Sequence, residues 1–198
     1  MKIYVFCRDI LRAIFTLLYR FEAVGTENIP KEGGVLLCSN HKSLLDPISV
    51  GIKVKRQVKF MAKEELFKVP VLGWLITKFG AFPVKRGGVS KESFKTSISI
   101  LRGGEIMGIF PVGTRFSDTG AAKKGAAMFA LRGNAAVVPA AIIGDYKIFR
   151  KMKIVYGQPI VLDDLKSGEV DGDPLELVTE RIMDRIHEME KTGRPSGN

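Results

Sequence analysis

The stretch that decides the fold is residues 34–47, Gly-Val-Leu-Leu-Cys-Ser-Asn-His-Lys-Ser-Leu-Leu-Asp-Pro. Its first part, Gly34 to Cys38, is a continuous apolar run of strand length. Its second part, Ser39 to Pro47, is a polar turn that carries a histidine and a carboxylate. Side chains in a loop that directly follows a buried strand can meet a substrate, so we take this stretch as the first candidate for the functional site.

Strands and helices are predicted to alternate on both sides of this stretch. Further apolar runs of strand length lie at 58–62, 81–84, 106–110, 136–143 and 153–156. Helical patterns cover Lys91 to Leu101 after a possible N-cap at Ser90, Lys123 to Arg132 before Gly133, and Leu175 to Met189. This alternation predicts an α/β class, with a single domain in which helices cover a mixed sheet.

Composition sets the size and the class of partner. A chain of 198 residues that is 45% hydrophobic can form one domain with a sizeable core. The formal net charge of +10 attracts nucleic acid, anionic lipid or phosphorylated substrates and does not by itself choose among them. Cys7 and Cys38 both lie in apolar stretches, which indicates packing residues in a reducing cytosol. The domain is expected to span residues 22–190, followed by a disordered tail at 191–198.

Residues 1–21 predict an amphipathic helix that is too short and too charged to span a membrane. The longest uncharged run, Ala13 to Tyr19, falls well below the roughly 20 residues that a span needs. No small-residue cleavage site follows, so a secretory signal is not expected. Apolar residues recur at helical spacing, namely Ile3, Phe6, Ile10, Ile14, Leu17 and Leu18. The helix either lies in a membrane interface with its arginines among the headgroups or packs on the domain's own core.

A second apolar segment, Leu66 to Phe79, crowds large side chains around Pro70 and Gly73. It carries too many of them for one face of a helix of that length. It is either a fully buried core helix or a segment that lines a lipid tunnel or dips into the membrane. Trp74, with lysines at the margins of the segment, slightly favours the interface.

His41 is the candidate general base. The chain has two histidines, and His187 falls in the exposed part of a charge-rich helix, where a solvated role is expected. Histidine is the natural base for a hydroxyl near neutral pH. Because Pro47 disfavours helical geometry at Asp46, we expect a helix that begins at Pro47 with Asp46 as its N-cap. The loop would then curl back so that Asp46 orients His41, although a simple capping role for Asp46 remains the alternative.

Two further loops carry cations beside glycines. Phe110 to Arg115 runs from a strand end into a glycine turn with a hydroxyl and a guanidinium, a combination suited to a phosphate. Gly80 to Gly88 again places basic residues at a strand end. Each loop alone is a weak signal because charged loops are usually just solvated. Together with His41 they describe a base beside an anion site.

These segments resemble the glycerolipid acyltransferase family, in particular bacterial 1-acyl-glycerol-3-phosphate acyltransferases. The family's Asn-His-x-x-x-x-Asp motif matches Asn40, His41 and Asp46. A glycine-to-arginine motif matches Gly80 to Arg86, the Phe-Pro-Glu-Gly-Thr-Arg motif matches Phe110 to Arg115, and an apolar strand with Val-Pro matches Val137 to Ala140. All four occur in the family's order.

The resemblance implies acyl transfer from a thioester, either of acyl carrier protein or of coenzyme A, to the sn-2 hydroxyl of 1-acyl-glycerol 3-phosphate. His41 would be the base and Asp46 its orienting carboxylate. The acceptor's phosphate would be bound by residues of the second and third motifs, namely Lys85, Arg86, Gly113, Thr114 and Arg115. Neither a metal nor another cofactor is implied. The protein would attach peripherally to an anionic membrane surface, at the cytoplasmic face of the cell membrane.

The sequence departs from the family pattern at Val112, where the third motif usually has Glu. This departure puts acceptor choice and turnover in doubt more than fold. A catalytically weak lipid-binding protein on the same fold, or an enzyme for glycerol 3-phosphate or another lysolipid, therefore remains an alternative. Nucleic acid is not an expected partner, because the basic residues are not arrayed with exposed aromatic residues on one sheet face.

Overall fold

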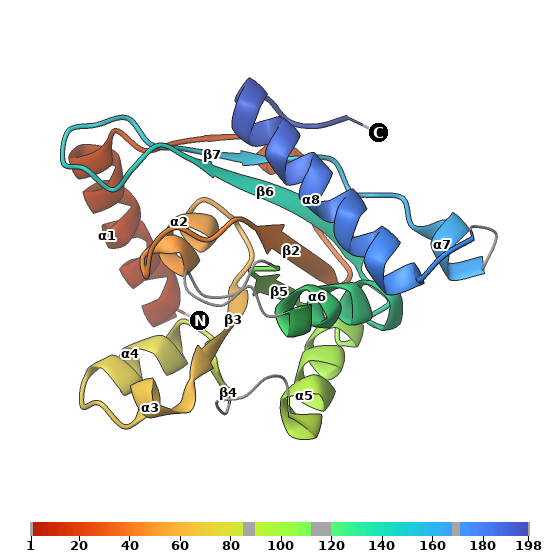
Figure 1. Ribbon diagram of the computed structural model, residues 1–198. Helices are drawn as coiled ribbons and strands as arrows, with labels where there is room; N and C mark the ends of the chain where they lie inside the picture. The colour runs from red at the N-terminus through yellow and green to blue at the C-terminus, as the bar shows by residue number, and fades with distance from the viewer. Residues whose placement is uncertain (1, 85–89, 112–119, 168–170, 198) are drawn as a thin grey trace.

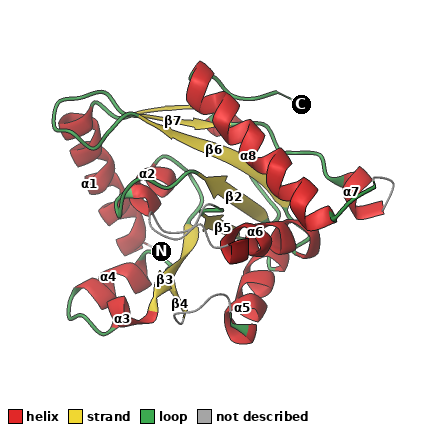
Figure 2. Ribbon diagram, viewed as in Figure 1, coloured by secondary structure: helices red, strands yellow, loops and turns green. Residues whose placement is uncertain are grey.

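The computed structural model describes residues 2–84, 90–111, 120–167 and 171–197 (Figures 1 and 2). The helices are α1 (Lys2–Tyr19), α2 (Asp46–Ile52), α3 (Glu64–Phe67), α4 (Leu72–Lys78), α5 (Lys91–Arg102), α6 (Gly120–Arg132), α7 (Asp163–Ser167) and α8 (Pro174–Thr192), with a 3₁₀ helix at Thr26–Asn28. The strands are β1 (Glu22–Val24), β2 (Val35–Ser39), β3 (Val58–Lys63), β4 (Phe82–Val84), β5 (Ile106–Ile109), β6 (Ala136–Ile143) and β7 (Lys153–Tyr156).

The strands form one mixed sheet in the order β1-β7-β6-β2-β5-β3-β4. Strand β2 lies in the middle and pairs in parallel with β5 and β6. Strands β3 and β4 continue this parallel half, whereas β7 runs antiparallel to β6 and pairs in parallel with β1. All five residues of β2 are buried, which explains why this strand is a continuous apolar run and not an alternating one.

Helices cover both faces of the sheet, as the sequence predicted (Figure 1). Helices α1 and α2 pack on one face, where Phe15, Val50 and Ile52 join the inward side chains of the strands. Helices α5, α6 and α8 cover the other face, where Phe129 and the buried stripe of α8 complete a second core. The predicted N-cap is confirmed, because Ser90 Oγ accepts a hydrogen bond of 3.1 Å from Ser93 N.

Helix α1 packs on the domain, one of the two arrangements that the sequence left open, and also leaves an apolar face exposed. One face packs on the domain: Phe15 is buried, and the guanidinium of Arg12 donates to the carbonyl of Ile52 at 3.0 and 2.7 Å. The opposite face is apolar and exposed, with Phe6 and Leu17 67% and 73% accessible. Among the described residues, no helix is long and apolar enough to cross a membrane.

Of the alternatives left open for Leu66 to Phe79, the structure excludes a fully buried core helix. The segment instead forms parts of the two short helices α3 and α4, and Gly73 is the one buried residue of α4. Val71 and Trp74 are 79% and 55% exposed. The helix pair extends from the carboxyl end of β3, beyond the ends of the central strands, so the sheet does not cover it (Figure 1).

The predicted disordered tail is also corrected. Residues 191 and 192 belong to α8, which ends at Gly193 in the left-handed conformation that favours glycine. The chain then packs back on the domain: Ser196 is buried, and its carbonyl accepts a 3.1 Å hydrogen bond from Gln158 N. The polar composition of residues 191–198 favoured disorder. The prediction was wrong because composition does not reveal contacts with residues far away in the sequence.

Candidate active site

The loop that follows β2 lies at the carboxyl edge of the parallel strands. Because β2 is central, its carboxyl end has β5 on one side and β6 on the other. In open α/β sheets this edge is where ligands bind, because the loops there expose polar groups above a packed core. Asn40, His41 and the start of α2 therefore lie where a substrate can reach them.

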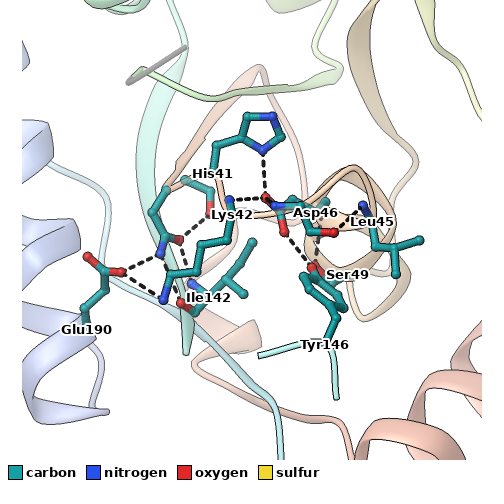
Figure 3. A network of polar contacts seen from close by, with 11 residues as sticks. His41, Lys42, Leu45, Asp46, Ser49, Ile142, Tyr146 and Glu190 are labelled. Carbon is teal, nitrogen blue, oxygen red and sulfur yellow. Dashed lines mark hydrogen bonds and ion pairs between the residues drawn. The ribbon is translucent and has the colours of Figure 1, made fainter. Parts of the chain in front are cut away.

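His41 and Asp46 meet in a buried hydrogen bond. His41 Nδ1 lies 2.7 Å from Asp46 Oδ2, and the Asp46 side chain is fully buried (Figure 3). The same carboxylate oxygen accepts from the backbone N–H groups of Lys42 and Ser43, at 2.5 and 2.7 Å. The loop thus folds back over the carboxylate, which decides between the two arrangements that the spacing left open.

The start of α2 differs by one residue from the expectation. The helix begins at Asp46, Leu45 is its N-cap, and Pro47 lies within the first turn. Asp46 does not cap the helix, because its carboxylate turns back to the N–H groups of the preceding loop and not forward to those of the helix. This rotation is what brings the carboxylate to His41.

The donors around Asp46 favour its ionised form. Burial opposes ionisation, but hydrogen bonds from His41, Ser43 N, Tyr146 and Lys42 N outweigh it and lower the pKa of the carboxyl. Because this folded-state pKa lies below the unfolded value, the ionised carboxylate stabilises the fold above pH ~4. The contribution is lost as the pH falls through the lowered folded-state pKa.

The imidazole of His41 lies between the carboxylate and an aromatic wall. Its ring stacks on Phe110 at 4.4 Å with an interplanar angle of 21°, and Phe110 in turn stacks on Phe60. The imidazole is 15% exposed. Within the described part of the chain, Nε2 has no hydrogen-bond partner. With Nδ1 on Asp46, Nε2 is the nitrogen available to take a proton.

Asn40 ties the loop to the neighbouring elements. Its side-chain carbonyl accepts from Ile142 N at 2.8 Å, and its amide donates to Ile142 O at 3.0 Å and Glu190 Oε1 at 2.6 Å (Figure 3). Glu190 of α8 also lies 3.4 Å from Lys42 Nζ. These contacts bind the side chains of Asn40 and Lys42, the residues before and after His41, to β6 and α8. They therefore fix the position of the backbone that carries the imidazole.

Sequence reasoning did not identify Tyr146, which contacts the dyad directly. Its hydroxyl donates to Asp46 Oδ1 at 2.6 Å. Burial, and then the hydrogen bond to Asp46, raise the pKa of this phenol, so it stays protonated and acts as a donor. The sequence shows that Tyr146 follows the apolar run 136–143, but the parallel pairing of β6 with β2, which brings it to the dyad, is a feature of the tertiary structure.

The predicted phosphate-binding residues Lys85, Arg86, Gly113, Thr114 and Arg115 lie outside the described residues, as does Val112. In the sequence, the segments that contain them directly follow β4 and Pro111. Both β4 and β5 belong to the half of the sheet that is parallel to β2. His187 is exposed on α8, as expected.

Known proteins are similar to this chain in sequence. The family model described as Acyltransferase matches residues 20–143. A 1-acyl-sn-glycerol-3-phosphate acyltransferase of Bacillus subtilis is 37% identical over 94% of this chain and 96% of the relative. A chloroplastic 1-acyl-sn-glycerol-3-phosphate acyltransferase of Arabidopsis thaliana is 33% identical over 66% of this chain, which spans 38% of that relative.

A solved structure has the same fold. The crystal structure of the 1-acyl-sn-glycerophosphate acyltransferase PlsC from Thermotoga maritima superposes with a TM-score of 0.69 and 22% sequence identity. The match covers 93% of this chain and 77% of the other. The mixed sheet with helices on both faces is therefore an arrangement already seen in an acyltransferase.

Proposed function

The chain belongs to the acyltransferase family, and from this premise we propose that it forms phosphatidic acid. The proposed reaction moves a fatty acyl group from an acyl thioester to the sn-2 hydroxyl of 1-acyl-glycerol 3-phosphate. The acceptor is the one named for the Bacillus subtilis and Arabidopsis thaliana relatives. Acyl carrier protein and coenzyme A are both suitable carriers of the thioester.

The observation that carries the proposal is the buried contact between His41 Nδ1 and Asp46 Oδ2. A carboxylate on Nδ1 holds the imidazole with its proton on that nitrogen, so Nε2 is free to act as a base. The proposed step begins when Nε2 removes the proton of the acceptor hydroxyl. The oxygen then attacks the thioester carbonyl, the C–S bond breaks, and the leaving thiolate takes a proton from the imidazolium. The ester and the free thiol are the products, without an acyl-enzyme.

Asp46 has two roles in this proposal. It fixes the tautomer before the reaction, and its negative charge stabilises the imidazolium that forms during it. Both roles need an ionised carboxylate, which its lowered pKa supports.

Thiol release tests the reaction class. An acyl thioester is mixed with the protein, with and without 1-acyl-glycerol 3-phosphate, and the free thiol is measured. Acceptor-dependent release supports the proposal. Release that responds to glycerol 3-phosphate or another lysolipid instead would correct the acceptor, and no release from folded protein that still binds lipid would favour the lipid-binding alternative.

Acceptor binding is proposed to depend on Lys85, Arg86, Gly113, Thr114 and Arg115. An arginine can hold two phosphate oxygens at once. We expect Arg115→Ala to raise KM for 1-acyl-glycerol 3-phosphate by about 10- to 100-fold, as loss of a charge-assisted hydrogen bond predicts, with a smaller change in kcat. Initial rates at varied acceptor concentration measure it, with Arg132→Ala on α6 as the control. An unchanged KM would assign the phosphate to other groups.

Peripheral attachment to the cytoplasmic face of an anionic membrane is proposed for the exposed apolar surfaces of α1 and α4. Phe6 and Leu17 project from α1, and Val71 and Trp74 project from the start of α4. The start of α1 contacts the end of α4, because the rings of Tyr4 and Phe79 meet edge to face at 5.6 Å. A net charge of +10 adds attraction to anionic headgroups.

We expect Phe6→Ser with Leu17→Ser to weaken binding to vesicles that contain phosphatidylglycerol by about 100-fold, because each large apolar side chain contributes ~1.5–3 kcal/mol when buried. Co-sedimentation measures the affinity. The matched control is Val161→Ser, which removes an apolar side chain that is 54% exposed and lies elsewhere on the fold. Equal binding by the double variant and the wild type would exclude α1 as the anchor, and Trp74→Ser would then test α4.

A further inference from the structure

Tyr146 contacts the dyad of His41 and Asp46 although it lies 100 residues after Asp46 in the sequence. It lies in the connection between β6 and β7 and is half-buried. Its hydroxyl donates to Asp46 Oδ1 at 2.6 Å and lies 2.8 Å from Ser49 Oγ (Figure 3). The single proton of the phenol goes to Asp46. The Ser49 hydroxyl, which also has one proton, lies within hydrogen-bond distance of two acceptors, the Tyr146 hydroxyl oxygen and the backbone carbonyl of Asp46 at 3.0 Å.

The two oxygens of Asp46 are held differently. Oδ2 accepts from His41, Lys42 N and Ser43 N. In the described part of the chain, Oδ1 accepts from Tyr146 alone. The donors on Oδ2 all come from residues close to Asp46 in the chain, whereas Tyr146 ties the carboxylate to the loop that follows β6. Rotation of the carboxylate about its Cβ–Cγ bond is therefore opposed at Oδ1 by this one hydroxyl.

We propose that Tyr146 is a positioning residue. Its hydroxyl holds the Asp46 carboxylate in one orientation, and in that orientation the carboxylate holds His41 towards the acceptor. This inference rests on the proposed function of the dyad. Tyr146 lies behind the carboxylate and does not contact the imidazole's free nitrogen, so it acts through Asp46 and not on the substrate.

Helix α1 holds Tyr146 in place. The ring of Tyr19, the last residue of α1, meets the Tyr146 ring edge to face at 5.8 Å and 87°. The same loop is bonded to the end of α1 by two backbone hydrogen bonds, Phe149 N to Leu18 O at 2.6 Å and Met152 N to Tyr19 O at 2.9 Å. The helix proposed to meet the membrane thus contacts the residue whose hydroxyl bonds to the Asp46 carboxylate, and the inference includes this connection.

Tyr146→Phe and Tyr156→Phe form a matched pair. Each removes one hydroxyl that bonds to α2, but Tyr156 donates to the carbonyl of Val50 at 2.8 Å and does not contact Asp46. We expect Tyr146→Phe to lower kcat by about 10- to 100-fold with KM for both substrates within about twofold, as loss of a hydrogen bond to a charged group predicts. Tyr156→Phe should keep kcat within about twofold at a temperature where both variants are folded.

A readout that does not need activity is the low-field proton resonance of the imidazole N–H that donates to Asp46, assigned by its disappearance in His41→Ala. This resonance should shift in Tyr146→Phe and stay in place in Tyr156→Phe. Equal kcat and an unmoved resonance in Tyr146→Phe would overturn the inference. If the wild type lacks acyl transfer, the proposed function fails, while the resonance still decides whether Tyr146 positions Asp46.

Two further variants test the parts of the arrangement. Ser49→Ala is close to isosteric at a buried position. It removes the hydroxyl that lies 2.8 Å from the Tyr146 hydroxyl and that also bonds to the Asp46 carbonyl, so kcat should fall about threefold. This variant also serves if Tyr146→Phe does not fold, and an unchanged kcat would then count against the inference.

Tyr19→Leu removes the ring contact with Tyr146 and keeps the hydroxyls of Tyr146 and Ser49. We expect kcat to fall by about 3- to 10-fold. Wild-type kcat in Tyr19→Leu would overturn the connection to α1.

Discussion

His41→Ala is expected to lower kcat for acyl transfer to 1-acyl-glycerol 3-phosphate by about 10²- to 10⁴-fold, the usual cost of removing a general base. Without the imidazole, the acceptor hydroxyl must lose its proton to water while it attacks the thioester. KM should change little, because His41 acts on the proton that moves in the transition state. The fold should survive, since Asp46 keeps its hydrogen bonds from Lys42 N, Ser43 N and Tyr146.

The control for this variant is His187→Ala, which removes the other histidine of the chain from an exposed position on α8. Its kcat should equal that of the wild type. Thiol release in the presence of the acceptor measures both variants, and circular dichroism compares their folding. Near-normal turnover in His41→Ala would remove this histidine from the mechanism, even though its contact with Asp46 is part of the structure.

Asp46→Asn is expected to lower kcat by about 10³- to 10⁴-fold, by analogy with the carboxylate of a Ser-His-Asp triad. An amide can face His41 in two ways. If its oxygen accepts from Nδ1, the imidazolium loses the negative charge that stabilises it. If its nitrogen donates to Nδ1, the imidazole carries its proton on Nε2 and cannot act as a base.

The same substitution should reduce the free energy of unfolding at neutral pH by about 1–3 kcal/mol, because buried donors lose a charged acceptor. Denaturant titration measures this, and the loss should shrink as the pH falls below ~4 and through the lowered folded-state pKa of Asp46. Asp164→Asn is the control, since it removes a carboxylate that pairs with Arg181 at 2.8 Å on α7 and α8, away from the dyad. A kcat equal to that of the wild type in Asp46→Asn would exclude Asp46 from the reaction.

Elements with local signals were predictable from the sequence. The buried strand β2, the N-cap at Ser90 and the buried stripe of α8 (Val178, Ile182, Ile186 and Met189) each depend on residues that are close together in the chain. The loop from His41 to Asp46 also has a local signal, because it lies between a buried strand and the proline in the first turn of a helix. Strand β1 was not predicted, because its three residues carry no clear alternation and gain their order by pairing with β7.

The sequence by itself determined the α/β class and the position of the loop after β2, because periodicity is a local property. The resemblance of the Asn-His-x-x-x-x-Asp motif to a known family singled out His41 and Asp46 as the candidate dyad, since their spacing alone left a simple capping role open. Only the tertiary structure decided which groups surround the dyad. Parallel pairing of β6 with β2 places Tyr146 on Asp46 Oδ1, and α8 brings Glu190 to Asn40. The tertiary structure also leaves Val71 and Trp74 exposed at the start of α4, and it binds Ser196 of the tail to the loop at Gln158. These outcomes depend on contacts between residues far apart in the chain, whose partners are fixed by packing and not by the local pattern.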